Sequence, residues 1–286
     1  MKNFFCLLVE CMCILACTSI HAQNTSIPVI DAHCHIKTTP QEALFPTMEE
    51  YFIENKSVNL QYLFGITVAR KGNMEQTKTQ NDSLFAMAAR DPRFIPVCSV
   101  HPGDGDAAIE ELQRIKQMGG KIIKLHPLTQ QFTIISEETV KLARKAGELG
   151  LVILTDGYGF FVPDYLEHLW QLTMVCPNTK FIIAHLGGTD FHKLVGLPMV
   201  QSLNPEMMKN VWYDLSATVA IYAGSPFQSQ FEWAIKAVGT DRVLFGSDQP
   251  AATLSKALNA FYQLDLTDSE REQILYKNAK ALLNLE

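Results

Sequence analysis

The sequence predicts an α/β protein, a (β/α)8 TIM barrel, and two observations support this prediction. Eight short β-branched runs recur along the 286 residues at a spacing of roughly 30, and helix-like stretches separate them. The runs are almost continuously apolar, as parallel strands covered on both faces should be. An open doubly wound sheet would place a glycine-rich phosphate turn after the first run, where this chain has histidines. The runs span residues 28–35, 62–69, 94–100, 121–126, 151–155, 180–185, 210–215 and 242–247.

The stretches between the runs carry helix signals in chain order. Residues 37–60 are the least regular part, and we expect a long loop with a short helix over the barrel mouth. Apolar residues then repeat in threes from Ile109 to Met118, and Gly119-Gly120 ends that helix. Ser136 can cap the next helix, and Thr267–Glu270 forms a capping box before the last one.

The first 22 residues are typical of a secretory signal peptide. Lys2 gives a short positive start, a mostly apolar stretch follows, and cleavage after Ala22 would leave one domain of residues 23–286. We therefore expect an exported protein, periplasmic or secreted. The alternative is a lipoprotein signal with Cys17 as the lipidated residue, which would attach the protein to a membrane.

Composition and charge narrow the class of protein. A chain with 47% hydrophobic and 19% charged residues can form a globular domain with one large core. Its formal net charge of −6 gives no electrostatic attraction to nucleic acid or to an anionic membrane. Beyond the leader only Cys34, Cys98 and Cys176 remain, too few for a disulfide framework, and we expect all three to be buried.

Polar residues stand at the ends of four apolar runs. The first run ends in His33 and His35, and their spacing of two turns both imidazoles to one face of a strand. The fourth, sixth and eighth runs end with Lys124 and His126, with His185, and with Asp248. A single strand-end histidine or aspartate is more often a capping or hydrogen-bonding residue. Four runs that end this way, with apolar interiors, favour a functional site at the C-terminal face of the barrel.

These residue types suit metal-assisted chemistry. Two imidazoles and a carboxylate can hold a divalent ion with an open coordination position, so His33, His35 and Asp248 are the predicted ligands. Such an ion lowers the pKa of a water toward ~7 and polarises a carbonyl group. A neighbouring histidine can protonate a leaving group. Lys124 and His126 are candidate substrate-binding residues.

Six motifs follow one another over nearly all of residues 23–286: Ile30–His35, Ser99–Asp104, Gly120–Pro127, Pro177–Gly188, Asp241–Asp248 and Asn278–Leu283. In this order and spacing they resemble the amidohydrolase superfamily, specifically its branch typified by aminocarboxymuconate-semialdehyde decarboxylase. The resemblance implies that His33 and His35 bind a divalent ion, usually zinc, and that Asp248 ligates it or handles its water's proton. It also implies that His185 is the catalytic histidine, that the substrate is a small molecule, and that a homodimer is possible.

The fifth run departs from the family pattern. The family ends this strand in His-x-Gly with a metal-binding histidine, and Thr155 occupies that position here. Asp156 is a further candidate ligand, but an undistorted strand is expected to point it away from the centre unless a bulge turns it inward. The departure predicts a weaker site, a harder preferred ion such as manganese, or no bound metal at all.

Three functions are compatible with these residues. The leading hypothesis is an exported metal-dependent hydrolase that acts on an ester, lactone or amide. The second is a non-oxidative decarboxylase that uses the same site. The third is a non-catalytic barrel that binds a ligand outside the cytoplasm and has a degenerate metal site, a hypothesis motivated by Thr155 in place of the family histidine.

Overall fold

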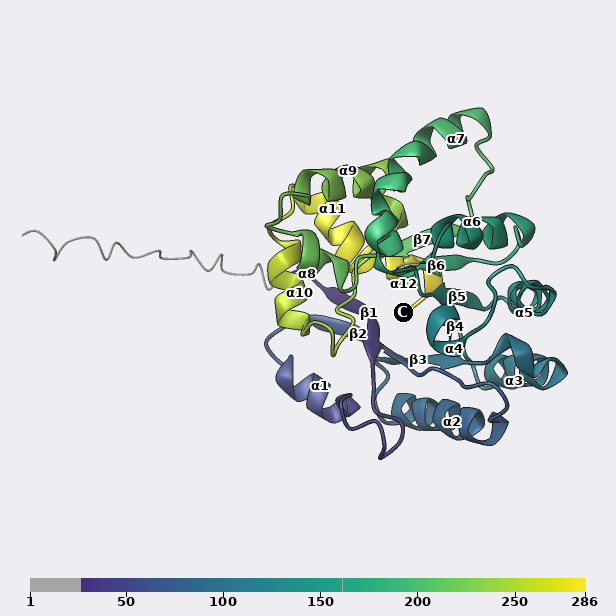
Figure 1. The fold of residues 1–286 in the computed structure, drawn as a ribbon. Helices are drawn as coiled ribbons and strands as arrows, with labels where there is room; N and C mark the ends of the chain where they lie inside the picture. Colours follow the sequence, from purple (N-terminus) through teal and green to yellow (C-terminus); the bar gives the residue numbers. More distant parts are fainter. Residues whose placement is uncertain (1–26, 161) are drawn as a thin grey trace, which may run out of the picture.

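The computed structural model describes residues 27–160 and 162–286, and it confirms the predicted barrel. Eight parallel strands follow one another in chain order, and helices cover their outer side (Figure 1). The predicted signal peptide and Cys17 lie outside the described residues. The strands are β1 (Val29–His35), β2 (Leu60–Ile66), β3 (Phe94–Ser99), β4 (Ile122–Leu125), β5 (Val152–Thr155), β6 (Phe181–Ile183), β7 (Val211–Asp214) and β8 (Val243–Leu244).

Backbone hydrogen bonds join the end of the sheet to its beginning. Ala32 N donates to Phe245 O at 3.0 Å, and Asp248 N donates to His33 O at 2.7 Å. The segment after β8 therefore runs beside β1, which brings the eighth strand end next to the first.

The helices form where their capping residues predict them. Ser136 accepts a hydrogen bond from Thr139 N at the start of α5, and Thr267 with Glu270 forms the expected capping box of α11. The expected short helix in residues 37–60 is α1. The α-helices are α1 (Met48–Glu54), α2 (Met74–Arg90), α3 (Asp106–Gln117), α4 (Pro127–Gln130), α5 (Glu137–Glu148), α6 (Tyr165–Val175), α7 (Leu197–Leu203), α8 (Thr218–Tyr222), α9 (Gln228–Val238), α10 (Leu254–Phe261), α11 (Asp268–Glu272) and α12 (Asn278–Leu283). Shorter 3-10 segments span Pro102–Asp104, Ala184–Gly196 and Thr240–Arg242, and a π-helical turn spans Gln273–Lys277.

The apolar residues separate into an inner and an outer layer. The larger cluster lies between strands and helices, and it includes the three free cysteines Cys34, Cys98 and Cys176, whose predicted burial is confirmed. The smaller cluster fills the barrel interior. Its strand residues are Ile30, Ala32, Phe64, Ile66, Val97, Ile122, Val152, Leu154, Ile182 and Leu244, and Ala184 joins them just after β6. The polar residues at the C-terminal ends of the strands lie on top of this apolar interior layer.

A bulge in β1 sets the direction of its histidines. Asp31 pairs with Leu63 and Cys34 with Gly65, so three steps on β1 oppose two on β2. One extra residue reverses the alternation of side chains. Ala32 therefore faces the interior before the bulge, and His33 and His35 face it afterwards, while Cys34 packs in the outer layer.

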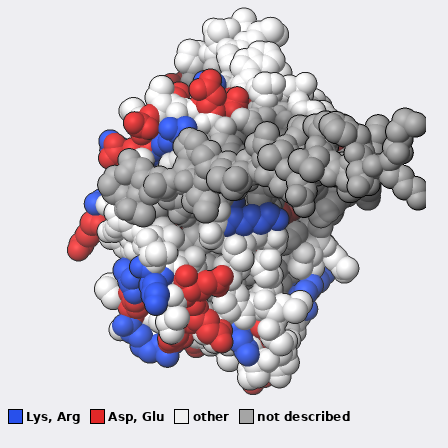
Figure 2. Space-filling view, turned by 90° about the vertical axis from the view of Figure 1, so that its left-hand side faces the viewer, with Lys and Arg blue, Asp and Glu red and all other residues white. Residues whose placement is uncertain are grey.

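The surface shown in Figure 2 carries both signs of charge. Lys and Arg side chains lie beside Asp and Glu side chains over the part of this face that is not grey. Within the described residues, no helix has both the length and the apolar character needed to cross a membrane.

Candidate metal centre and active site

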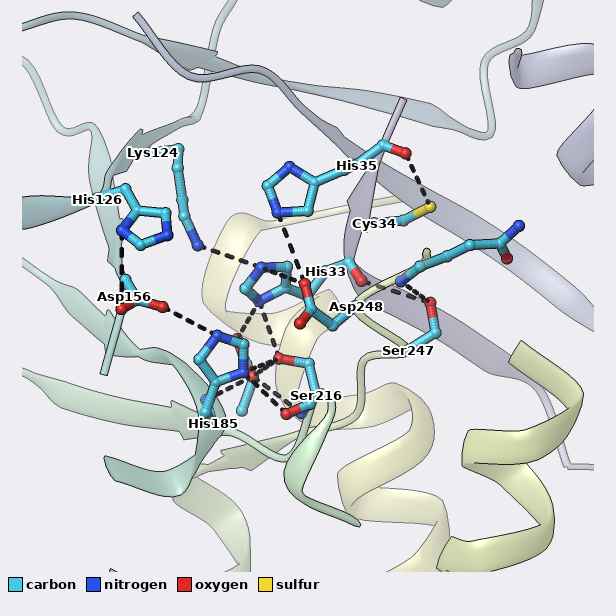
Figure 3. Close-up of polar contacts among 12 residues, drawn as sticks. His33, Cys34, His35, Lys124, His126, Asp156, His185, Ser216, Ser247 and Asp248 are labelled. Atoms are coloured by element: carbon cyan, nitrogen blue, oxygen red, sulfur yellow. Dashed lines mark hydrogen bonds and ion pairs between the residues drawn. The ribbon is translucent and has the colours of Figure 1, made fainter. Parts of the chain in front are cut away.

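The first and eighth strand ends bring three potential ligands together. Asp248 Oδ1 lies 3.4 Å from His33 Nε2 and 3.6 Å from His35 Nε2 (Figure 3). The His33 side chain is fully buried, whereas His35 and Asp248 keep 17% and 16% exposure. A substrate would therefore reach the site past His35 and Asp248. Phe45 stacks on the His35 ring, with centroids 5.4 Å apart.

Asp214, at the end of β7, fixes the tautomer of His33. Asp214 Oδ2 lies 3.0 Å from His33 Nδ1, and Ser216 Oγ lies 2.9 Å from the same nitrogen. A buried carboxylate accepts, so Nδ1 carries the proton and Nε2 keeps its lone pair. Burial in turn lowers the pKa of His33 to about 4, so the ring is neutral. A neutral imidazole whose second nitrogen is held by a carboxylate is how metal-binding histidines are commonly oriented.

Lys124 on β4 points into the same space. It is 1% exposed, and its Nζ donates to His33 Nε2 at 3.1 Å. Burial lowers the pKa of Lys124, and the carboxylates of Asp156, Asp248 and Asp214 oppose that effect.

The expectation that Asp156 would point away from the centre is wrong. Val152 and Leu154 belong to the interior layer, while Ile153 packs in the outer layer. Simple alternation therefore turns Asp156 inward without a bulge, and Asp156 is 3% exposed. The aligned Thr155 belongs to the outward-facing set of β5.

Asp156 pairs with His185, which follows β6. Asp156 Oδ1 lies 3.0 Å from His185 Nε2, and the backbone oxygen of Ser216 lies 2.9 Å from His185 Nδ1. Both ring nitrogens face acceptors, so both carry protons and the ring is an imidazolium. Burial lowers the pKa of His185, but the Asp156 hydrogen bond and the charges of Asp248, Asp156 and Asp214 outweigh it and raise the pKa to about 9. The same pairing holds the pKa of Asp156 below its usual range despite burial.

The backbone around His185 and Gly246 gives these side chains room. His185 has a φ of 62°, and its backbone N–H donates to Asp214 Oδ1 at 3.0 Å. Gly246 approaches β1 so closely that an added Cβ would lie 2.8 Å from His33 Cβ and 3.1 Å from Ser216 Cβ. A side chain at position 246 would therefore displace His33.

Asp31 lies beneath the site and binds Ser247, which follows β8. Its carboxylate accepts from Ser247 N at 2.8 Å and from Ser247 Oγ at 2.6 Å, and Tyr51 OH donates to it as well. Burial raises the pKa of Asp31 to about 6. This carboxylate fixes the residue that precedes Asp248.

The structure places the predicted site residues near one another, and each has its own hydrogen-bond or ion-pair partner. His33, His35, Asp248, His185 and Lys124 meet at one centre (Figure 3). His126 lies at its edge, with Nδ1 3.7 Å from Asp156 Oδ2. Among the described residues, ligand atoms of His33, His185 and Asp248 all lie within 4.8 Å of one another. His185 Nε2 is already bonded to Asp156, so the nitrogens with lone pairs belong to His33 and His35. The donor set fits a divalent ion.

Sequence reasoning missed Asp214 and Ser216. Asp214 ends the run at 210–215 just as Asp248 ends the eighth, and that position was the available signal. Ser216 contacts both buried histidines through its hydroxyl, at 2.9 Å from His33 Nδ1 and 3.1 Å from His185 Nδ1.

The fold and the site define a TIM-barrel enzyme with a divalent metal site at its C-terminal face. The sequence model described as amidohydrolase matches residues 30–285, so the chain belongs to that family. No curated protein matches the chain significantly.

Solved structures share this fold at low sequence identity. The 5-carboxyvanillate decarboxylase from Sphingomonas paucimobilis has a TM-score of 0.71 at 12% identity, covering 91% of this chain and 100% of that one. The 2,6-dihydroxybenzoate decarboxylase from Rhizobium has a TM-score of 0.69 at 17% identity, covering 90% and 99%. A protein described as probable 2-pyrone-4,6-dicarboxylic acid hydrolase from Acinetobacter baumannii has a TM-score of 0.67 at 18% identity, covering 90% and 99%.

Proposed function

We propose that the protein is a metal-dependent hydrolase that acts on a small carbonyl substrate with an ester, lactone or amide linkage. The observation that carries the proposal is the pair formed by Asp248 and His185, a carboxylate and an imidazolium that flank His33. Asp248 Oδ1 is 3.4 Å from His33 Nε2, and the His33 and His185 rings are 5.0 Å apart. Hydrolysis needs a base for the water proton and an acid for the leaving group, and this pair offers one of each.

The proposed metal ligands are His33, His35 and Asp248. A divalent ion bound there would polarise the substrate carbonyl and lower the pKa of a water. We propose zinc, since two imidazoles and one carboxylate form a common catalytic zinc set with an open position. Manganese is the alternative, because two decarboxylases of the same fold were solved with bound manganese.

The proposed roles follow from the partners of each side chain. Asp248, partly exposed beside His35, accepts the proton of the attacking water. His185 donates a proton to the leaving-group atom, and its pKa of about 9 keeps it protonated near neutral pH. Asp156 and the Ser216 carbonyl hold that ring in place. Asp214 keeps the His33 lone pair directed at the centre.

A non-oxidative decarboxylase is the second candidate, and one observation favours it. Lys124 and His185 place two buried basic groups at one site, which suits a substrate carboxylate. His126 at the edge would then help to bind the substrate. The decarboxylases among the structural neighbours support the same chemistry. Membership of the amidohydrolase family favours either enzyme over a non-catalytic barrel.

A substrate panel in labelled water tests the two chemistries. The panel contains aryl esters, lactones such as 2-pyrone-4,6-dicarboxylate, and aromatic acids such as 2,6-dihydroxybenzoate. Hydrolysis incorporates ¹⁸O from water into the product, whereas decarboxylation releases carbon dioxide. We expect ¹⁸O incorporation, and a loss of about 100-fold or more in kcat for Asp248→Asn and His185→Gln. Release of carbon dioxide without ¹⁸O incorporation would replace hydrolysis by the second candidate.

We also propose that the protein is exported through residues 1–22 and that its physiological partner is a small molecule. Mass spectrometry of the protein recovered from the periplasm or the medium tests the predicted cleavage after Ala22. A mature N-terminus at Cys17 that carries lipid would support the lipoprotein alternative instead. A homodimer stays a prediction, to be tested by light scattering.

A further inference from the structure

The buried lysine on β4 has no chemical step in the proposed hydrolysis. Lys124 is 1% exposed, and its aliphatic stem continues the inner face of β4 above Ile122. Its Nζ ends 3.1 Å from His33 Nε2, so the ammonium lies among the residues that would hold a metal (Figure 3).

The lone pair of His33 Nε2 can serve only one partner at a time. Asp214 holds the proton on Nδ1, so Nε2 has a single lone pair in the plane of the ring. In this structure that lone pair accepts the Lys124 hydrogen bond. A metal bond to His33 uses the same lone pair, and therefore requires Lys124 to leave it.

The charges around Lys124 oppose the effect of burial, which lowers the pKa of its amine. Three carboxylates, those of Asp156, Asp248 and Asp214, attract Lys124. With Lys124 protonated and His185 an imidazolium, two cations face three anions, so these five side chains sum to one negative charge. A divalent ion reverses this balance to one net positive charge. With an uncharged side chain at position 124, the site with its divalent ion bound would carry no net charge.

We propose that Lys124 competes with the divalent ion for His33 Nε2 and so sets the metal affinity of the site. While Lys124 holds the lone pair of His33 Nε2, its ammonium offsets part of the negative charge of the three carboxylates. When the ion binds, Lys124 leaves His33 Nε2. The inference rests on the proposed metal site, but it concerns binding alone and does not depend on which reaction follows.

Metal titration of neutral variants tests the proposal. Lys124→Met and Lys124→Gln remove the charge, and Lys121→Met is the matched control. Lys121 lies just before the same strand, and its Nζ donates to Leu283 O at 3.0 Å and Asn284 O at 2.9 Å, away from the site. Dissociation constants for Zn²⁺ and Mn²⁺ are measured against a chromophoric chelator, without substrate. We expect about tenfold or greater tightening for both Lys124 variants, since a like charge next to the ion is removed, and no change for Lys121→Met.

Two results would overturn the proposal that Lys124 competes with the ion for His33. One is an affinity that is unchanged or weaker in whichever Lys124 variant folds, as judged by circular dichroism. The other comes from the wild type, in which added Zn²⁺ should shift the Lys124 side-chain ¹⁵N resonance. A resonance that stays unshifted at saturating Zn²⁺ would mean that Lys124 does not leave His33. A protein that shows competition but no hydrolysis would contradict only the proposed reaction.

Discussion

Replacing Asp156 by asparagine removes the charge that keeps His185 protonated. The two side chains are buried, and Asp156 Oδ1 lies 3.0 Å from His185 Nε2. Asparagine has nearly the same shape as aspartate, so the substitution changes charge more than packing. It leaves the imidazole bonded to the Ser216 carbonyl, which still fixes its orientation.

The size of the effect follows from the pKa of His185. That pKa is about 9 in the folded protein, against an ordinary value of 6.5. Without Asp156, burial favours the neutral ring, and we expect the pKa to fall to about 6.5 or lower. At pH 8 the protonated fraction would drop from ~90% to ~3%, about a 30-fold loss of the acid form. At pH 6 the loss would be less than about twofold.

Two assays report this change. The ring-proton resonances of His185, followed by NMR from pH 5 to 10, give its pKa without any substrate. The pH profile of kcat should show a basic limb that moves from near pH 9 to near pH 6.5 in Asp156→Asn. Asp190→Asn is the control, because Asp190 follows β6 on the same segment but pairs with Lys193 at 3.0 Å.

The reasoning would be refuted by a His185 pKa that stays near 9 in Asp156→Asn. Another source would then hold the proton, and Asp248 with Asp214 would be the remaining candidates. A uniform loss of activity at every pH would also contradict the account, since it would indicate a structural role for Asp156 rather than an electrostatic one.

Three further predictions concern residues that position the side chains of the site. Asp214→Asn removes the carboxylate that fixes the tautomer of His33. We expect the variant to bind metal about 10- to 100-fold more weakly, as measured by calorimetry. An unchanged affinity would show that Asp214 does not orient His33. Gly246→Ala forces a methyl group to within 2.8 Å of His33 Cβ, and we expect the free energy of unfolding in urea to fall by about 1–3 kcal/mol. The control is Gly196→Ala, whose methyl group would point into open space, and we expect a loss of less than about 0.5 kcal/mol. Equal costs would contradict the close approach. The raised pKa of His185 stabilises the fold fully below pH ~6.5, and this contribution, at most about 3 kcal/mol, is lost as pH rises through about 9. Wild-type Tm should therefore fall more than that of Asp156→Asn between pH 6.5 and 9, and parallel curves would argue against the pairing.

Much of the fold could be predicted from the sequence, because its signals are local and repeated. Each apolar run of β-branched residues became a strand, and alternation alone divides β4 correctly, with Ile122 inside and Ile123 outside. The capping residues also act locally, which is why Ser136 and Thr267 mark the starts of α5 and α11 correctly.

The direction of single side chains was harder to predict, since it depends on register. The inward turn of His33 relies on a bulge opposite β2, and the sequence has no local sign of that extra residue. For Asp156 the signal is present in the sequence, but aligning the family histidine with Thr155 predicts the opposite direction for the Asp156 side chain. Counting from Val152 and Leu154 would have placed its side chain inside.

Asp214 illustrates a different limit. Asp214 is the last residue of β7, but a single strand-end aspartate has many structural explanations. Its importance comes from the contact with His33 Nδ1, 181 residues earlier in the chain. Only the closed barrel creates that contact.

The central claim is that His33 and His35 form a divalent metal site despite the threonine at position 155. The most direct test is the metal content of the purified protein, measured by inductively coupled plasma mass spectrometry beside a His33→Ala/His35→Ala variant. We predict close to one zinc or manganese ion per chain in the wild type and none in the variant. A wild type without metal after growth in added zinc and manganese, or equal metal in both proteins, would contradict the claim.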